Sequence, residues 1–122
     1  MMKNITKEKE TIEKILILKL SDSDRTIPFG DKKGLLERAN GAWRIGLPRI
    51  KGVKKALLLF RGRVLAEYEI GSKIIVDENN DYRLTFDMRE KENSQYKDRI
   101  LDYRTANPAS VIEAEKIKYR KA

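Results

Sequence analysis

The sequence predicts a mainly β (α+β) fold, either a small, partly closed β-barrel or a strongly curved antiparallel sheet with one or two short helices. Short apolar or alternating runs recur along the chain and are separated by Gly, Asn, Asp or Pro. A chain of 122 residues, 40% hydrophobic and 38% charged, suits one domain with a modest core. Closing or curving the sheet would protect its edges from pairing with other chains.

The domain is expected to cover residues 15–119, after an extension at residues 1–14. Ile5 and Ile12 in the extension are spaced for one helical stripe, which allows a short helix. Residues 15–20 (ILILKL) are typical of a buried strand. The loop that follows holds Asp22 and Asp24, which are more typical of an acidic turn than of a cation site.

A short helix is predicted over residues 31–40, because Asp31 can cap its start and Asn40-Gly41 can end it. Residues 42–47 are predicted as a strand that carries Trp43 and stops before Pro48.

The clearest element is a hairpin, in which Arg61-Gly62 is the turn between strands at 56–60 and 64–70. The second strand alternates, so its side chains are assigned to two faces. One face takes Val64, Ala66, Tyr68 and Ile70, and the other takes Leu65, Glu67 and Glu69.

Short strands joined by turns are predicted for the rest of the chain. Ser72-Lys73 should interrupt the sheet after the hairpin. Strands are then predicted at 74–76, 82–88 and 100–103, of which the second alternates clearly. Turns are predicted at 77–81 and 107–108, and a polar loop or short helix at 89–99. Residues 109–119 are ambiguous. Asn107 as a cap and Pro108 after it favour a helix, whereas the β-branched Val111 and Ile112 allow a strand.

The composition excludes several classes of chemistry. The chain has no Cys and no His, which excludes disulfides, thiolate sites, imidazole bases and most zinc sites. No apolar run is long enough for a membrane span, and no signal-peptide core opens the sequence. We therefore expect a cytoplasmic protein without a cofactor or a metal.

Positive charge is concentrated between Trp43 and Lys73, where eight basic residues face only Glu67 and Glu69. This gives +6 of the net +8 of the chain. A local basic surplus attracts polyanions, although it is also typical of a solvated basic surface. The candidate residues for binding nucleic acid or a nucleotide-like anion are Trp43, Arg44, Lys51, Lys54, Lys55, Arg61, Arg63, Arg83, Phe86 and Asn107. If the hairpin forms, five of them are expected to gather near one end of the sheet: Lys51, Lys54, Lys55, Arg61 and Arg63.

Several candidates also have a purely structural interpretation. Trp43 and Phe86 are expected in the core, with base stacking as the alternative. Arg83 is expected either to pair with Glu67 or Glu69 or to reach a phosphate. Asn107 suits the Asn-Pro turn better than a base edge.

Catalysis would have to rely on carboxylates, Lys, Tyr or a hard metal such as magnesium. Glu67 with Glu69, and Glu113 with Glu115, would each share a face if both lie on strands. A magnesium-dependent nuclease needs two or three such acids to converge, with a lysine such as Lys116 nearby. These spacings are generic, so we expect no enzyme.

With this pattern laid out, the chain resembles a small, poorly characterised bacterial β-domain that occurs alone or after GIY-YIG nuclease domains. The motifs that carry the resemblance are ILILKL, LLERANGAWRIG, ALLLFRGRVLAEYEI, RLTF and Asn107-Pro108, over roughly residues 15 to 115. The resemblance implies a barrel-like module, akin to the PUA-type barrels that bind RNA, and it favours a strand over residues 109–119. The GIY-YIG segment is absent, so no nuclease activity carries over. The Trp usual after the hairpin is absent as well, and the segment after Asn107-Pro108 departs from the usual aromatic-containing strand.

The expected function is therefore a non-catalytic module that binds nucleic acid or a nucleotide-like anion. The alternative is a protein-interaction module, for example a small inhibitor of a nucleic-acid-acting defence enzyme.

Overall fold

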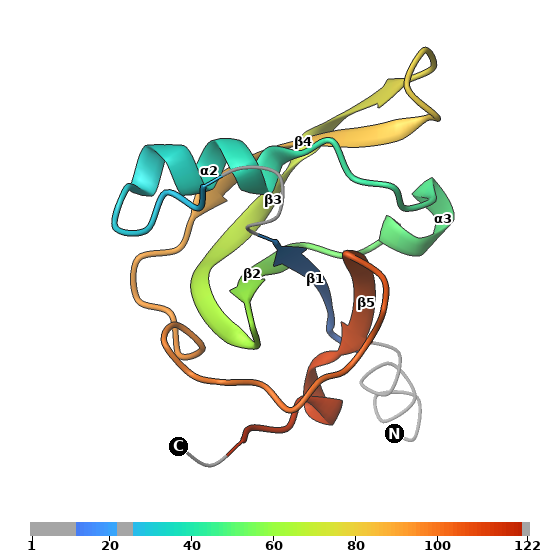
Figure 1. Cartoon of the computed structure of the whole chain (residues 1–122). Coiled ribbons are helices and arrows are strands. Elements are labelled where there is room, and N and C mark those ends of the chain that lie inside the picture. Colours follow the sequence, from blue (N-terminus) through green and yellow to red (C-terminus); the bar gives the residue numbers. More distant parts are fainter. Residues whose placement is uncertain (1–11, 22–25, 121–122) are drawn as a thin grey trace, which may run out of the picture.

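The computed structural model describes residues 12–21 and 26–120 (Figure 1). The predicted helix in residues 1–14 and the pair Asp22 and Asp24 lie outside the described residues. The strands are β1 (Lys14–Leu20), β2 (Lys55–Phe60), β3 (Arg63–Asp77), β4 (Arg83–Glu90) and β5 (Ala109–Glu113). The helices are α2 (Lys32–Asn40), the single turn α3 (Leu47–Ile50) and the 3-10 turn η1 (Ala114–Lys116).

The five strands form one mixed sheet in the order β4-β3-β2-β1-β5. β1 and β2 run parallel, with Leu20 opposite Phe60, and the other neighbouring pairs are antiparallel. The sheet curves strongly but β4 and β5 do not pair, so it is not closed (Figure 1). This confirms the prediction of a mainly β, curved sheet with short helices. The prediction that the sheet is antiparallel throughout is wrong, because β1 and β2 run parallel.

The central strands are buried on both faces, which explains their continuous apolar sequences. Leu16 and Leu58 belong to a core cluster that includes residues of α2, whereas Ile17 and Leu57 belong to a second cluster on the other face. The first cluster is covered by α2 and Trp43. The second is covered by the segment between β4 and β5 and by the C-terminal segment.

A β-bulge near the start of β3 makes one predicted face assignment wrong. Leu58 pairs with Ala66 but Leu59 pairs with Val64, so Leu65 is the extra residue. Val64 therefore packs in the second cluster, whereas Ala66 and Tyr68 pack in the first. Simple alternation had placed all three on one face.

Ser72-Lys73 does not interrupt the sheet, because β3 continues through this point with a second irregularity between Ile70 and Ile74. β3 and β4 extend beyond the rest of the sheet as a two-stranded arm that ends in the predicted turn at 77–81 (Figure 1).

The predicted helix at 31–40 is confirmed as α2, and the Asp31 carboxylate accepts a hydrogen bond from the Gly34 N–H at 3.1 Å. The predicted strand at 42–47 is wrong. Only Trp43 bridges to β4, through Leu84, and Pro48 lies in the first turn of α3 instead of ending a strand.

The ambiguous C-terminal segment begins as β5 and then turns through η1, so the strand prediction holds for residues 109–113. Residues 91–99 form an irregular loop, and Ile100 and Leu101 make isolated bridges to Arg63 and Tyr119. No helix in the described part of the chain is long and apolar enough to cross a membrane.

Candidate anion-binding site

A pocket of about 680 Å³ lies where the two parallel strands β1 and β2 end. Because these strands run in the same direction, their last residues, Leu20 and Phe60, lie side by side at one end of the sheet. The C-terminal half of the chain supplies the opposite wall, through residues 101–106 and Arg120.

Four basic side chains line this pocket, and Asp102 is its only carboxylate among the described residues. The four come from separate parts of the sequence: Lys19, Arg61, Arg104 and Arg120. The polar side chains of Ser21, Tyr103 and Thr105 complete the lining. The lining that the structure describes is therefore strongly cationic, with hydroxyl groups that can donate hydrogen bonds.

The hairpin turn presents Arg61. Its backbone has a φ of 51°, and Gly62 follows with a φ of 86°, as a tight two-residue turn requires. The guanidinium carbon lies 5.0 Å from the centroid of the Phe60 ring, a cation–π distance. These contacts direct the side chain along the end of β2.

Arg120 is fixed by backbone contacts of the C-terminal segment. Its N–H donates to the Ile100 carbonyl at 2.8 Å, and its guanidinium donates to the Arg61 carbonyl at 3.4 Å. Lys19 donates to the Thr105 carbonyl. Each of these two cations has further donors beyond the one so engaged.

Arg104 is exposed and makes no hydrogen bond or ion pair with any other residue the structure describes. The preceding residue, Tyr103, anchors this segment, because its hydroxyl forms a 2.8 Å hydrogen bond with the hydroxyl of Ser110. An unpaired guanidinium on an anchored segment suits recognition of an anion.

The expected gathering of five basic residues near one end of the sheet is wrong. Arg61 follows the last residue of β2, whereas Lys55 is its first, and Lys51 and Lys54 precede it. At roughly 3.3 Å per residue, the two groups are about 20 Å apart along the strand. Arg63 is exposed near the turn and donates to the Asp98 carbonyl at 2.9 Å.

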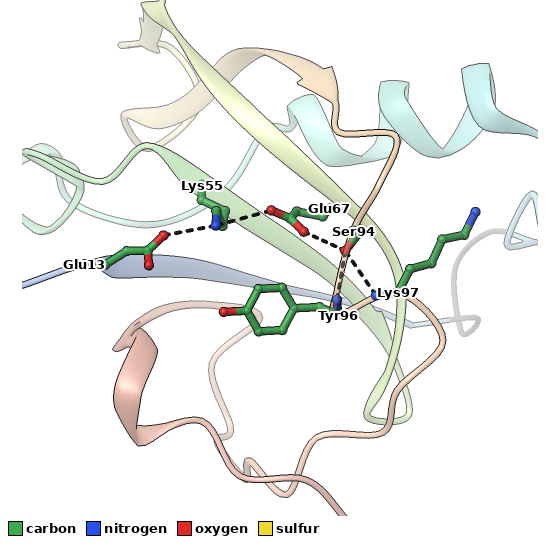
Figure 2. Close-up of polar contacts among 6 residues, drawn as sticks. All are labelled: Glu13, Lys55, Glu67, Ser94, Tyr96 and Lys97. Carbon is green, nitrogen blue, oxygen red and sulfur yellow. Dashed lines mark hydrogen bonds and ion pairs between the residues drawn. The ribbon is translucent and has the colours of Figure 1, made fainter.

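Lys55 is engaged by carboxylates, as Figure 2 shows. Its ammonium lies 3.0 Å from a Glu13 oxygen and 3.4 Å from a Glu67 oxygen. Burial acts to lower the pKa of Lys55, but the two carboxylates together outweigh it and raise that pKa above its ordinary value. Lys55 is therefore a structural cation.

Glu67 is the buried centre of this network, with its side chain 1% exposed. Its other oxygen accepts a hydrogen bond from the Ser94 hydroxyl at 2.6 Å, and that hydroxyl accepts from the backbone N–H groups of Tyr96 and Lys97 (Figure 2). The carboxylate thus fastens the loop after β4 to β3.

Trp43 and Phe86 are core residues, with 8% and 3% of their surface exposed. The indole N–H of Trp43 donates to the Ala39 carbonyl at 2.8 Å, which ties it to α2. Neither ring offers an open face to a base, so the core alternative holds for both.

The remaining candidates lie outside the pocket lining. Arg44 pairs with Asp81 at 2.7 Å on the β3–β4 arm. Arg83 donates to the Ala42 carbonyl at 3.4 Å, and the expected partner Glu69 pairs with Arg89 instead. Asn107 is exposed, and its N–H donates to the Thr105 hydroxyl at 3.2 Å, as in a turn.

The predicted carboxylate pairs do not form a convergent cluster. Glu67 is buried whereas Glu69 is exposed. Glu113 ends β5 and pairs with Lys116 at 3.8 Å, while Glu115 lies in η1, so strand spacing does not apply to them. Among the described residues, no group of three or more carboxylates is placed to hold a metal ion.

Sequence reasoning missed Lys19, Arg104 and Arg120. Lys19 had a weak signal, as a lone cation near the end of an apolar strand. Arg104 and Arg120 had none, because only the folded chain brings the C-terminal segment to the ends of β1 and β2.

No family model matches the chain, and neither the curated proteins nor the solved structures give a match. The resemblance to the bacterial β-domain therefore stays a prediction.

Proposed function

We propose that this protein is a non-catalytic module that binds the phosphate groups of nucleic acid or of a nucleotide in the pocket at the ends of β1 and β2. The observation that carries the proposal is that, among the residues the structure describes, four basic side chains and one carboxylate line an open pocket. Phosphate is the anion that suits this donor set, because guanidinium and ammonium groups bind its oxygens through charge-assisted hydrogen bonds.

The size of the pocket supports a ligand that inserts a group. Its volume of about 680 Å³ lies within the roughly 300–1,000 Å³ of pockets that hold small ligands. A nucleotide unit or the end of a strand fits this description better than the flat side of a duplex.

The non-catalytic part of the proposal rests on how the strand carboxylates are used. Glu67 is occupied by Ser94 and Lys55, and Glu69 pairs with Arg89. The absence of Cys supports a cytoplasmic location, where thiols stay reduced and disulfides are rare.

The test measures binding of fluorescent single-stranded oligonucleotides and of nucleoside phosphates at several salt concentrations. We expect affinity for the oligonucleotides to fall with salt, because each neutralised phosphate contributes about 0.7 to the log–log slope for single strands. The double variant Arg61→Gln with Arg104→Gln should lower that slope by about one unit.

The matched control is Lys51→Gln with Lys54→Gln, which removes two exposed charges at the opposite end of β2. It should leave affinity and slope nearly unchanged. No binding at low salt would overturn the proposal and favour a protein partner. Equal effects of the two double variants would mean that total charge, not the pocket, drives binding.

A further inference from the structure

An exposed aromatic ring is linked to the basic pocket through the end of β2. Phe29, in the loop before α2, has 59% of its surface exposed. Its ring meets the Phe60 ring edge to face, with 5.4 Å between centroids and 67° between planes.

Phe60 links this ring to the pocket. It is the last residue of β2, and the Arg61 guanidinium lies over its ring at 5.0 Å. Since Arg61 also lines the pocket, the series Phe29, Phe60, Arg61 runs from an exposed ring to the cationic lining.

A single exposed aromatic side chain is ordinary by itself. Phe29 differs because its ring is oriented by a second aromatic residue, which itself carries a pocket cation on its ring. Proteins that bind single-stranded nucleic acid combine these two features, a basic groove for the backbone and aromatic rings for the bases.

We infer that the basic pocket and Phe29 form one site for single-stranded nucleic acid, in which a phosphate enters the pocket and an unpaired base stacks on Phe29. This inference rests on the proposed function and specifies its ligand class. A duplex should bind less well, because its bases are already stacked and paired and offer no free face near the backbone.

The experiment separates the base from the phosphate. Short oligothymidylate and oligouridylate are compared with an abasic strand of the same length and phosphate count, and with a duplex. Phe29→Ala should weaken binding of the two base-containing strands by about 5- to 150-fold, the usual effect of removing one stacking ring. It should leave binding of the abasic strand unchanged.

Two variants control for side effects of the substitution. Tyr82→Ala removes an aromatic side chain of similar exposure on the distant β3–β4 arm, and it should change nothing. Phe29→Trp should keep binding, and its indole fluorescence should be quenched by oligothymidylate. In the native protein, the buried Trp43 should not be quenched.

Each result points one way. If Phe29→Ala has no effect and the abasic strand binds as tightly as oligothymidylate, the stacking inference is overturned while the phosphate proposal stands. Equal weakening of the abasic and base-containing strands, or preference for duplex, also overturns it. If no strand binds at low salt, both proposals fall. Oligouridylate compared with oligodeoxyuridylate, which differs from it only in the 2′-hydroxyl, would identify RNA or DNA as the preferred source.

Discussion

The two ends of β2 carry charge in opposite ways. At its start, Lys55 lies between Glu13 and Glu67, so its ammonium is matched by carboxylates. At its far end, four basic side chains share a pocket with Asp102 as the only carboxylate the structure describes there. The two ends are neighbours in sequence and look alike as basic segments.

The difference shows that a charge surplus counted along the sequence does not locate a binding surface. A lysine beside a buried carboxylate is committed to the fold, and its field is cancelled close by. Cations gathered without matching carboxylates keep their field and can attract an anion. Three changes test this contrast, from the largest expected effect to the smallest.

The first change removes the buried carboxylate. Glu67→Ala should lower the free energy of unfolding by about 2–4 kcal/mol, because the partly buried Lys55 and the Ser94 hydroxyl lose an internal partner. We expect this loss of unfolding free energy to be smaller than for a fully buried ion pair, because the Lys55 side chain is 23% exposed and keeps its ion pair with Glu13. Urea denaturation followed by circular dichroism measures it.

The double variant Lys55→Met with Glu67→Leu is the matched control. Replacing both charges by apolar groups should recover most of the stability. If the double variant is as unstable as Glu67→Ala, the loss comes from packing and not from an unpaired charge.

The second change concerns Tyr68, opposite Ala56 near the start of β2. Its hydroxyl is buried, with no hydrogen-bond partner among the described residues. Tyr68→Phe should therefore raise the free energy of unfolding by about 1 kcal/mol at neutral pH, by removing a buried polar group without a partner. A loss of stability would mean that the hydroxyl is in fact satisfied in solution.

The gain in unfolding free energy from Tyr68→Phe should grow at alkaline pH. Burial, with a smaller contribution from Glu90, raises the pKa of Tyr68 well above its ordinary value. Above about pH 10 the unfolded chain releases this proton while the folded chain keeps it, so the Tyr68 contribution is lost as pH rises. The difference between Tyr68→Phe and the native protein should increase by roughly 1 kcal/mol per pH unit there. A difference independent of pH would contradict the raised pKa.

The third change removes the carboxylate from the basic pocket. Asp102→Asn should tighten binding of oligothymidylate by about threefold, because one charge that repels the phosphate is lost. The gain is small because solvent and salt already screen this repulsion. Glu78→Gln, in the turn of the β3–β4 arm, removes an exposed carboxylate elsewhere and should have no effect. Equal gains for both variants would show that net charge alone controls affinity.

The local elements were largely predictable because their signals are local. Asp31 and Asn40-Gly41 marked α2, and Arg61-Gly62 marked the hairpin. The strand at 42–47 and the common face of Val64 and Ala66 were wrong, because strand pairing and the bulge depend on the partner strand. Two of the four basic residues in the pocket, Arg104 and Arg120, gave no signal of a site in the sequence. They reach the pocket only because of the path that the C-terminal segment takes in the fold.

The sequence by itself determined the fold class, the positions of β1 and β2 and the surplus of positive charge. Alternation, turn residues and composition act over a few neighbours, so they can be seen without knowing the topology. Only the tertiary structure decided which cations are paired and which are open, because that depends on contacts between distant segments. Lys55 meets a buried carboxylate of the neighbouring strand, whereas Arg104, which lines the pocket where two parallel strands end, pairs with no other residue that the structure describes.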